Sequence, residues 1–168
     1  MRDQRPQPPK GAHEDVILFT VGGFRFAIAA YAVGEIRGTE GLRPYTAVPG
    51  SNRIGKVEFI LERNGETYFV VDSAKHFSLI RSAALSAARV LILRKTCAAV
   101  LVDSTDRMTE ITVLLALPQA FTGDERNWYR GLTILNDDVV PVVNQDAFLS
   151  KAEAAILKTE RITGVAAV

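Results

Sequence analysis

The sequence predicts an all-β fold of two small barrels followed by one C-terminal helix, and three patterns support this. Gly22-Gly23 and Asn64-Gly65 each separate two β-prone runs, and such dipeptides supply the positive φ angles of a tight hairpin turn. Turn-and-strand patterns recur in the second half of the chain. Helical spacing of apolar residues appears only from Asn144 onward.

The expected strands are short apolar or alternating runs separated by turn residues. In chain order they are 16–21, 24–30, 56–62, 67–72, 89–95, 97–103, 105–113, 130–136 and 139–144. The segment 78–88, SLIRSAALSAA, loses β character, which predicts a linker or a short helix. Residues 1–15 combine three prolines with polar and charged residues, which predicts a flexible tail.

The two halves of the chain resemble each other at a fixed spacing. NGETYFVVD begins at Asn64 and NDDVVPVVN begins at Asn136, and we call the shift that carries Asn64 onto Asn136 the repeat offset. The same shift places 26–29 on 98–101 and Glu35-Ile36 on Arg107-Met108. We therefore predict a duplicated unit of about five short strands, the usual content of a small barrel.

This duplication gives the expected domain limits. They are an N-terminal tail (1–15), a first barrel (16–80), a linker (81–88), a second barrel (89–143) and a C-terminal helix with its tail (144–168). The helix is predicted from apolar residues spaced at i, i+4, i+7 and i+8, namely Phe148, Ala152, Ala155 and Ile156.

Composition narrows the class of protein. The 168 residues carry a formal net charge of +1, so we do not expect a nucleic-acid partner. Since no apolar run approaches the roughly 20 residues that cross a bilayer, we do not expect insertion into a membrane. With one cysteine, Cys97, and two histidines, no disulfide or tetrahedral zinc site is expected, and the reducing cytoplasm is the expected compartment. The chain is expected to be a monomer without cofactor or metal.

Catalytic chemistry has little support in the sequence. Asp72-Ser73 and Asp103-Ser104 each end a Val-rich strand and resemble the turns of aspartic peptidases, but the glycine of each turn is replaced. Strand-end capping explains both aspartates. A dimeric acid peptidase remains an alternative that needs Asp72 and Asp103 side by side. His13, His76 and Cys97 lack a triad context, so we expect a protein that is not an enzyme.

An ordered set of motifs resembles CheW-like domains. The motifs are Phe19-Thr20-Val21-Gly22, Phe26-Ala27-Ile28, Val33-Gly34-Glu35-Ile36-Arg37-Gly38, Val48-Pro49, Ile54-Gly55, Val70-Val71-Asp72, Val100-Leu101-Val102-Asp103, Arg130-Gly131-Leu132 and Val142-Val143. Each motif is weak alone, but their order over about nine tenths of the chain is fairly specific.

The resemblance implies two five-stranded barrels of Src-homology-3 type, packed side by side. It also implies a non-catalytic adaptor that links the cytoplasmic tip of a chemoreceptor to the regulatory domain of a chemotaxis histidine kinase. The implied kinase-facing residues are Val33, Glu35, Ile36, Arg37, Gly38 and Gly55. The implied receptor-facing residues are Arg63, Asn64, Val100, Val102, Asp103 and Met108. Val33 and Ile36 can also be read as barrel core.

One departure from the family pattern bears on receptor binding. The family's Asn-Leu-Arg-Gly hairpin is replaced by Glu62-Arg63-Asn64-Gly65, so Asn64 stands where arginine is expected and Arg63 comes one residue early. Because strands alternate faces, this shift turns Arg63 to the opposite side. Two alternatives follow: a divergent paralogue of a pilus-type or other chemosensory system with altered or lost receptor binding, or a small-molecule-binding barrel.

Overall fold

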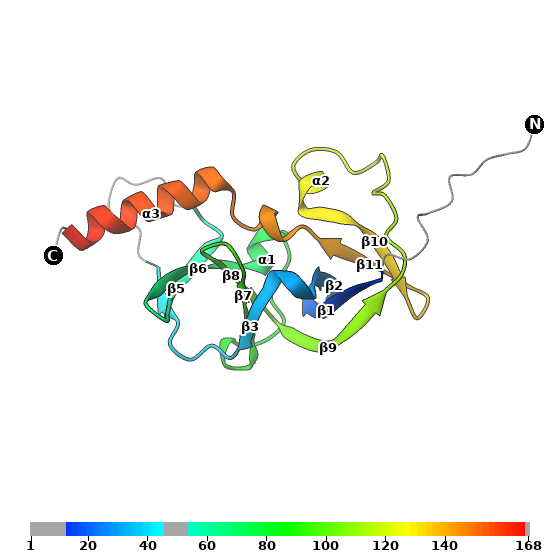
Figure 1. Cartoon of the computed structure of the whole chain (residues 1–168), viewed down its shortest axis with the longest axis horizontal. Coiled ribbons are helices and arrows are strands. Elements are labelled where there is room, and N and C mark those ends of the chain that lie inside the picture. Colours follow the sequence, from blue (N-terminus) through cyan, green and yellow to red (C-terminus); the bar gives the residue numbers. More distant parts are fainter. Residues whose placement is uncertain (1–12, 46–53, 167–168) are drawn as a thin grey trace, which may run out of the picture.

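The computed structural model describes residues 13–45 and 54–166, which form two β-sheets, short helical turns and one long helix (Figure 1). Barrel A has the strand order β10-β11-β2-β1-β9, and barrel B has the order β3-β7-β8-β6-β5-β4. The strands of barrel A are β1 (Glu14–Val21), β2 (Phe24–Ala29), β9 (Ser104–Ile111), β10 (Tyr129–Leu135) and β11 (Asp138–Val143). Those of barrel B are β3 (Val33–Arg37), β4 (Arg43–Pro44), β5 (Val57–Arg63), β6 (Glu66–Asp72), β7 (Arg89–Leu93) and β8 (Ala98–Val102).

The predicted hairpins are confirmed at the turns that carry the strongest signals. Gly22 and Gly23 join β1 to β2 with φ of 59° and 82°, and Asn64 and Gly65 join β5 to β6 with φ of 51° and 77°. Positive φ at both central residues matches the right-handed twist of the flanking strands. β1 begins at Glu14, inside the range predicted as a tail, and residues 1–12 of that range lie outside the described residues, as does Val48-Pro49.

The sheets do not follow the predicted barrel ranges 16–80 and 89–143. β1 and β2 pair with β9, β10 and β11, whereas all strands from β3 to β8 belong to barrel B. Each sheet is completed by a parallel pair, β11 with β2 in barrel A and β6 with β8 in barrel B. Parallel strands cannot be joined by a tight turn, so no local signal marks these pairs in the sequence.

The duplication itself appears in the register of the strands. Val70 pairs with Ala99 in barrel B, and Val142 pairs with Ala27 in barrel A, so both partners are related by the repeat offset. The same shift relates the pair Arg43–Ile60 to the isolated bridge Leu115–Leu132. The two barrels are therefore equivalent, although each draws strands from both halves of the sequence.

The main hydrophobic core joins the two barrels. One cluster of buried residues contains Phe19 and Ile28 of barrel A together with Phe69 and Val100 of barrel B. His76 and Phe148, which the repeat offset relates to each other, contact across this junction with ring centroids 4.9 Å apart. Two smaller clusters fill the rest of each barrel. The two barrels thus share one continuous hydrophobic core at their junction.

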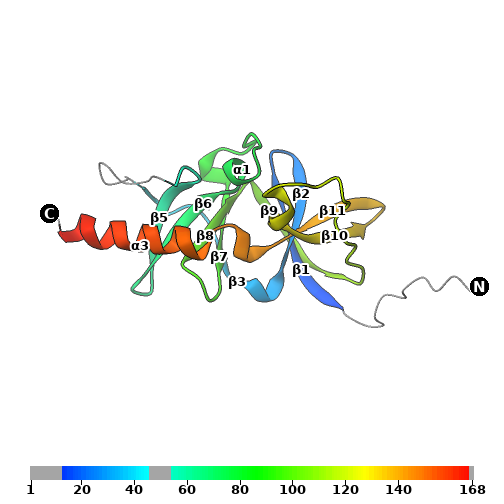
Figure 2. The same ribbon diagram turned by 90° about the horizontal axis from the view of Figure 1, so that it is seen from above.

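Three α-helices accompany the described sheets: α1 (Ser73–His76), α2 (Glu125–Trp128) and α3 (Lys151–Ala166). Figure 2 shows α3 running along barrel B and away from barrel A. Ser150 and Glu153 exchange side-chain to backbone hydrogen bonds of 3.0 Å and form a capping box at the start of α3. Lys56 holds Glu153 at 3.1 Å, and fully buried Leu157 anchors the helix to the core.

The C-terminal helix is confirmed, but its predicted start and buried face are wrong. Asn144 follows the last residue of β11, its side chain accepts a hydrogen bond from the amide of Asp146, and α3 begins only at Lys151. Phe148 is buried as predicted, but it precedes the helix, whereas Ala152, Ala155 and Ile156 are exposed. Because Phe148 lies before the helix, counting the helical spacing from it assigned the wrong residues to the buried face.

Candidate docking surfaces

Strand β3 carries most of the residues predicted to face a kinase. Along it the side chains alternate, so Val33 is 6% exposed and lies in the core while Ile36 is 41% exposed. Glu35 and Arg37 are half-buried, and the Arg37 guanidinium donates to the Glu40 carbonyl at 2.8 Å. Val33 therefore belongs to the core, whereas Ile36 is an exposed apolar side chain.

The two glycines of the predicted kinase-facing set differ in their surroundings. Gly38 is half-buried against the Glu40 carboxylate, which a Cβ at this position would meet. Gly55 is exposed, and among the described residues no atom lies within 4 Å of the position that a Cβ would take. A side chain at Gly38 would displace only the flexible Glu40 carboxylate, so neither position requires glycine for packing within the described part of the chain.

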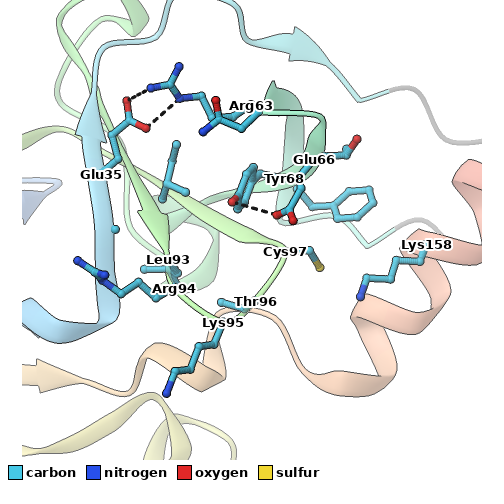
Figure 3. Close-up of a pocket in the computed structure, with 15 residues that line it drawn as sticks. Glu35, Arg63, Glu66, Tyr68, Leu93, Arg94, Lys95, Thr96, Cys97 and Lys158 are labelled. Carbon is cyan, nitrogen blue, oxygen red and sulfur yellow. Dashed lines mark hydrogen bonds and ion pairs between the residues drawn. The ribbon is translucent and has the colours of Figure 1, made fainter.

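A bidentate ion pair joins β3 to the end of β5. The Arg63 guanidinium donates to both Glu35 carboxylate oxygens, at 3.0 and 3.1 Å (Figure 3). The sequence assigned these residues to different partners, but the structure brings them together. The contact is partly exposed to solvent, so it contributes little to stability. Its effect is to occupy the Arg63 side chain.

An open groove of about 1280 Å³ lies beside this ion pair at the mouth of barrel B. We call it the charged groove. Its walls come from β3, the β5–β6 hairpin, the β7–β8 hairpin and α3 (Figure 3). It is lined by Gly34, Glu35, Arg63, Asn64, Glu66, Thr67, Tyr68, Phe69, Ile92, Leu93, Arg94, Lys95, Thr96, Cys97 and Lys158. Burial and the nearby Glu66 carboxylate raise the pKa of the Tyr68 hydroxyl.

A second groove of about 460 Å³ lies at the equivalent end of barrel A, and we call it the apolar groove. It is lined by Gly23, Phe24, Arg25, Phe26, Phe77, Leu79, Tyr129, Asp138, Val139, Val140 and Pro141. The repeat offset relates Phe24 to Thr96 and Val139 to Thr67. Phe24 is 60% exposed and Val139 62% exposed, so apolar side chains stand here where the charged groove has threonines.

The residues predicted to face a receptor do not form one surface. Val100 and Val102, which were predicted to face a receptor, are instead buried in the core, because β8 is a central strand covered on both faces. Arg63 and Asn64 lie at the β5–β6 turn of barrel B. Met108 lies on β9 of barrel A and is 60% exposed. Met108 is the residue of this set that stays available as an apolar contact.

Asp103 is a structural residue at the crossing from barrel B to barrel A. It is 5% exposed, and one carboxylate oxygen accepts from the Gly22 amide at 2.7 Å and from the amide and hydroxyl of Ser82. Burial raises the pKa of this carboxyl, but these donors outweigh it and hold the pKa below its usual range. Asp103 thereby ties the β1–β2 turn to the linker, which explains its place better than receptor contact.

The peptidase alternative is not supported by the surroundings of the two aspartates. Asp72 caps α1 by accepting from the Ala74 amide at 3.0 Å and pairs with Arg81 at 2.5 Å. A proton-sharing dyad raises the pKa of one carboxyl, whereas the pKa of Asp103 is lowered. Each carboxylate instead has its own set of donors, as expected for strand-end caps.

His76, which the sequence left without a role, lies in an aromatic cluster at the junction of the barrels. Its ring lies 5.1 Å from Trp128 and 4.9 Å from both Phe77 and Phe148. Burial, with a smaller effect from Lys56 and an opposing one from Glu153, lowers the pKa of His76 to about 4. His76 is therefore a neutral core aromatic at neutral pH.

No helix within 13–45 and 54–166 is long and apolar enough to cross a membrane. In the same ranges, His, Cys, Asp and Glu side chains do not gather in threes in a way that could hold a metal ion.

Two joined barrels with exposed edges and open grooves define a protein of the docking or scaffold class. The comparisons with known proteins agree. The family model for the CheW-like domain matches residues 15–153, so the chain belongs to the CheW-like domain family. The comparison with curated protein sequences returned no match.

A solved structure with a similar fold is the scaffolding protein TtCheW from Thermoanaerobacter tengcongensis. The similarity has a TM-score of 0.69 at 16% sequence identity and covers 91% of this chain and 95% of that chain. This likeness confirms the predicted fold of two Src-homology-3-like barrels with a C-terminal helix. The CheW-like family is a family of non-catalytic scaffolds, in line with the prediction of a protein that is not an enzyme.

Proposed function

We propose that this protein is an adaptor with two docking faces, which couples a chemoreceptor to a chemotaxis histidine kinase in the cytoplasm. The observation that carries the proposal is the equivalence of Ile36 and Met108. The repeat offset relates these two side chains, and both are exposed on strands that end their sheets, β3 and β9. Such apolar side chains with charged neighbours suit moderate, reversible protein contacts.

The kinase regulatory domain docks on β3 in this proposal. Ile36 supplies the apolar anchor, Glu35 and Arg37 supply the polar rim, and Gly55 leaves the approach open. The receptor tip docks on β9 around Met108. Two equivalent faces on one rigid core allow both partners to bind at once, because the shared core fixes the barrels relative to each other.

Binding of the kinase regulatory domain tests this assignment. Glu35→Lys reverses the charge at the rim and is expected to weaken binding about tenfold in calorimetric titration. Glu125→Lys, at the start of α2 beside barrel A, makes the same charge change away from β3 and serves as the matched control. Unchanged affinity of the Glu35→Lys variant would count against β3 as the kinase-facing strand.

A second candidate function is a paralogue with altered receptor binding, and one observation favours it. The Arg63 side chain, nearest in sequence to the family's receptor-contacting arginine, is engaged by Glu35 in two hydrogen bonds. Asn64 holds the position that the family pattern gives to arginine. In this form the protein serves a pilus-type or other chemosensory array, and a tip fragment of its receptor binds weakly or not at all.

A further inference from the structure

Strand β3 ends the sheet of barrel B and has a free hydrogen-bonding edge. Within the described residues it pairs only with β7, on one side. Gly34 and Ile36 on this strand are exposed. The unpaired amides and carbonyls of an edge strand form a template for one more strand.

The charged groove provides the space for such a strand. Gly34 and Glu35 of β3 line the groove, which has a volume of about 1280 Å³. β3 reaches β5 through the side chains of Glu35 and Arg63, not through a strand ladder. Two extended side chains span more than the roughly 4.8 Å between paired strands. The groove beside β3 can therefore hold an extended peptide.

Cations dominate the rim of the groove. Arg94, Lys95 and Lys158 line it, and all three are exposed. In the described part of the chain, no carboxylate lies within ion-pair distance of Lys95 or Lys158. Of the two acidic residues in the lining, Glu35 is already paired with Arg63, which leaves Glu66. An acidic segment therefore complements this rim.

We propose that β3 accepts an extended acidic segment of a protein partner as an additional strand in the charged groove. The proposal depends on the proposed function only for the identity of the partner: the segment would belong to the protein that docks on β3. Backbone hydrogen bonds to β3 supply the orientation, and the cationic rim selects the charge. The apolar groove has Gly23 where the charged groove has Lys95, and its Arg25 is balanced by Asp138 at 4.0 Å, so it lacks this excess of cations.

The test uses synthetic peptides and needs no kinase, so its failure is distinct from failure of the proposed function. A fluorescein-labelled heptapeptide of alternating glutamate and valine is titrated with the whole protein and followed by anisotropy. We expect it to bind at least about tenfold more tightly than the matching lysine–valine peptide. Backbone NMR shifts on adding the acidic peptide should centre on β3. Equal affinity of the two peptides, or shifts centred on barrel A, would overturn the proposal.

Two sets of variants separate the charge from the strand pairing. Lys95→Glu combined with Lys158→Glu is expected to weaken the acidic peptide about tenfold, whereas Lys151→Glu, exposed at the start of α3 and absent from the groove lining, should not. Two peptides are compared, one N-methylated at its odd-numbered residues and one at its even-numbered residues. One of them should lose binding and the other should keep it, because only alternate amides of a strand face the neighbouring strand. Equal effects of the two methylated peptides would contradict strand addition.

Discussion

The charged groove of barrel B and the apolar groove of barrel A occupy equivalent places in a duplicated fold, yet they differ in chemistry. Thr67 and Thr96 line the first where Val139 and Phe24 line the second. Both grooves reach the shared core, the apolar groove through Phe77 and the charged groove through Phe69 and Leu93. The charged groove is rimmed by exposed cations, whereas the apolar groove holds the ion pair Arg25–Asp138. The duplicated fold thus keeps its backbone register while the side chains at the two barrel ends differ.

The largest expected effect concerns the aromatic floor of the apolar groove. Phe77 is 6% exposed and stacks on Phe26 with ring centroids 4.6 Å apart. Phe77→Ala should lower the free energy of unfolding by about 3–5 kcal/mol, because it leaves a cavity in the shared core. Tyr68→Ala in the charged groove, where the ring is half-buried, should cost about 1 kcal/mol. Urea denaturation of both variants measures this contrast, and equal losses would contradict it.

The next effect concerns His76 and its equivalent, Phe148. The pKa of His76 is about 4 in the folded protein against 6.5 for an ordinary histidine. Since the unfolded chain binds the proton more readily, stability is complete above pH 6.5 and falls as the pH drops toward 4. At about 1.4 kcal/mol per pH unit, the loss over this window is about 3 kcal/mol.

His76→Phe would make the two equivalent positions identical and should remove this part of the pH dependence. Unfolding free energies measured at pH values from neutral down to about 4.5 give the slope for each protein. The wild-type protein measured in parallel gives the reference slope. If the His76→Phe variant keeps the wild-type slope, the acid sensitivity has another origin.

The smallest effect concerns the first turn residue of two equivalent hairpins. Asn64 has φ of 51° and Asn136 has φ of 49°, a conformation that asparagine tolerates better than most residues. Asn64→Arg and Asn136→Arg should each cost about 1–2 kcal/mol of stability. Only Asn64→Arg restores the family's arginine, so only this variant should strengthen binding of a receptor-tip fragment in a pull-down. Equal binding by both variants would argue against the idea that the shift of the arginine from position 64 to position 63 weakens receptor binding.

The parts of the fold that could be predicted from the sequence are those fixed by local or periodic signals. Gly22-Gly23 and Asn64-Gly65 specify their hairpins directly, and the repeat offset holds in strand pairing. The exchange of strands between the barrels had no such signal, because parallel pairs form between distant segments. A repeat shows which strands are equivalent, but not which sheet each one joins.

The docking surfaces were less accessible to sequence reasoning. The alternation along β3 could not decide which face is buried, and the structure sends Val33 inward and Ile36 outward. The charged groove combines Arg94 and Lys95 of one hairpin with Lys158 of α3, residues that no motif connects. One signal was available in advance: the repeat offset, which places Glu35-Ile36 on Arg107-Met108, already paired the two exposed anchors.

The central claim is that two equivalent edge strands hold two different partners. The direct measurement is a cross-titration of Ile36→Asp and Met108→Asp against the kinase regulatory domain and a receptor-tip fragment. We expect Ile36→Asp to weaken kinase binding at least about tenfold and spare the receptor, and Met108→Asp to do the reverse. Loss of the same partner in both variants, or of neither, would contradict the account.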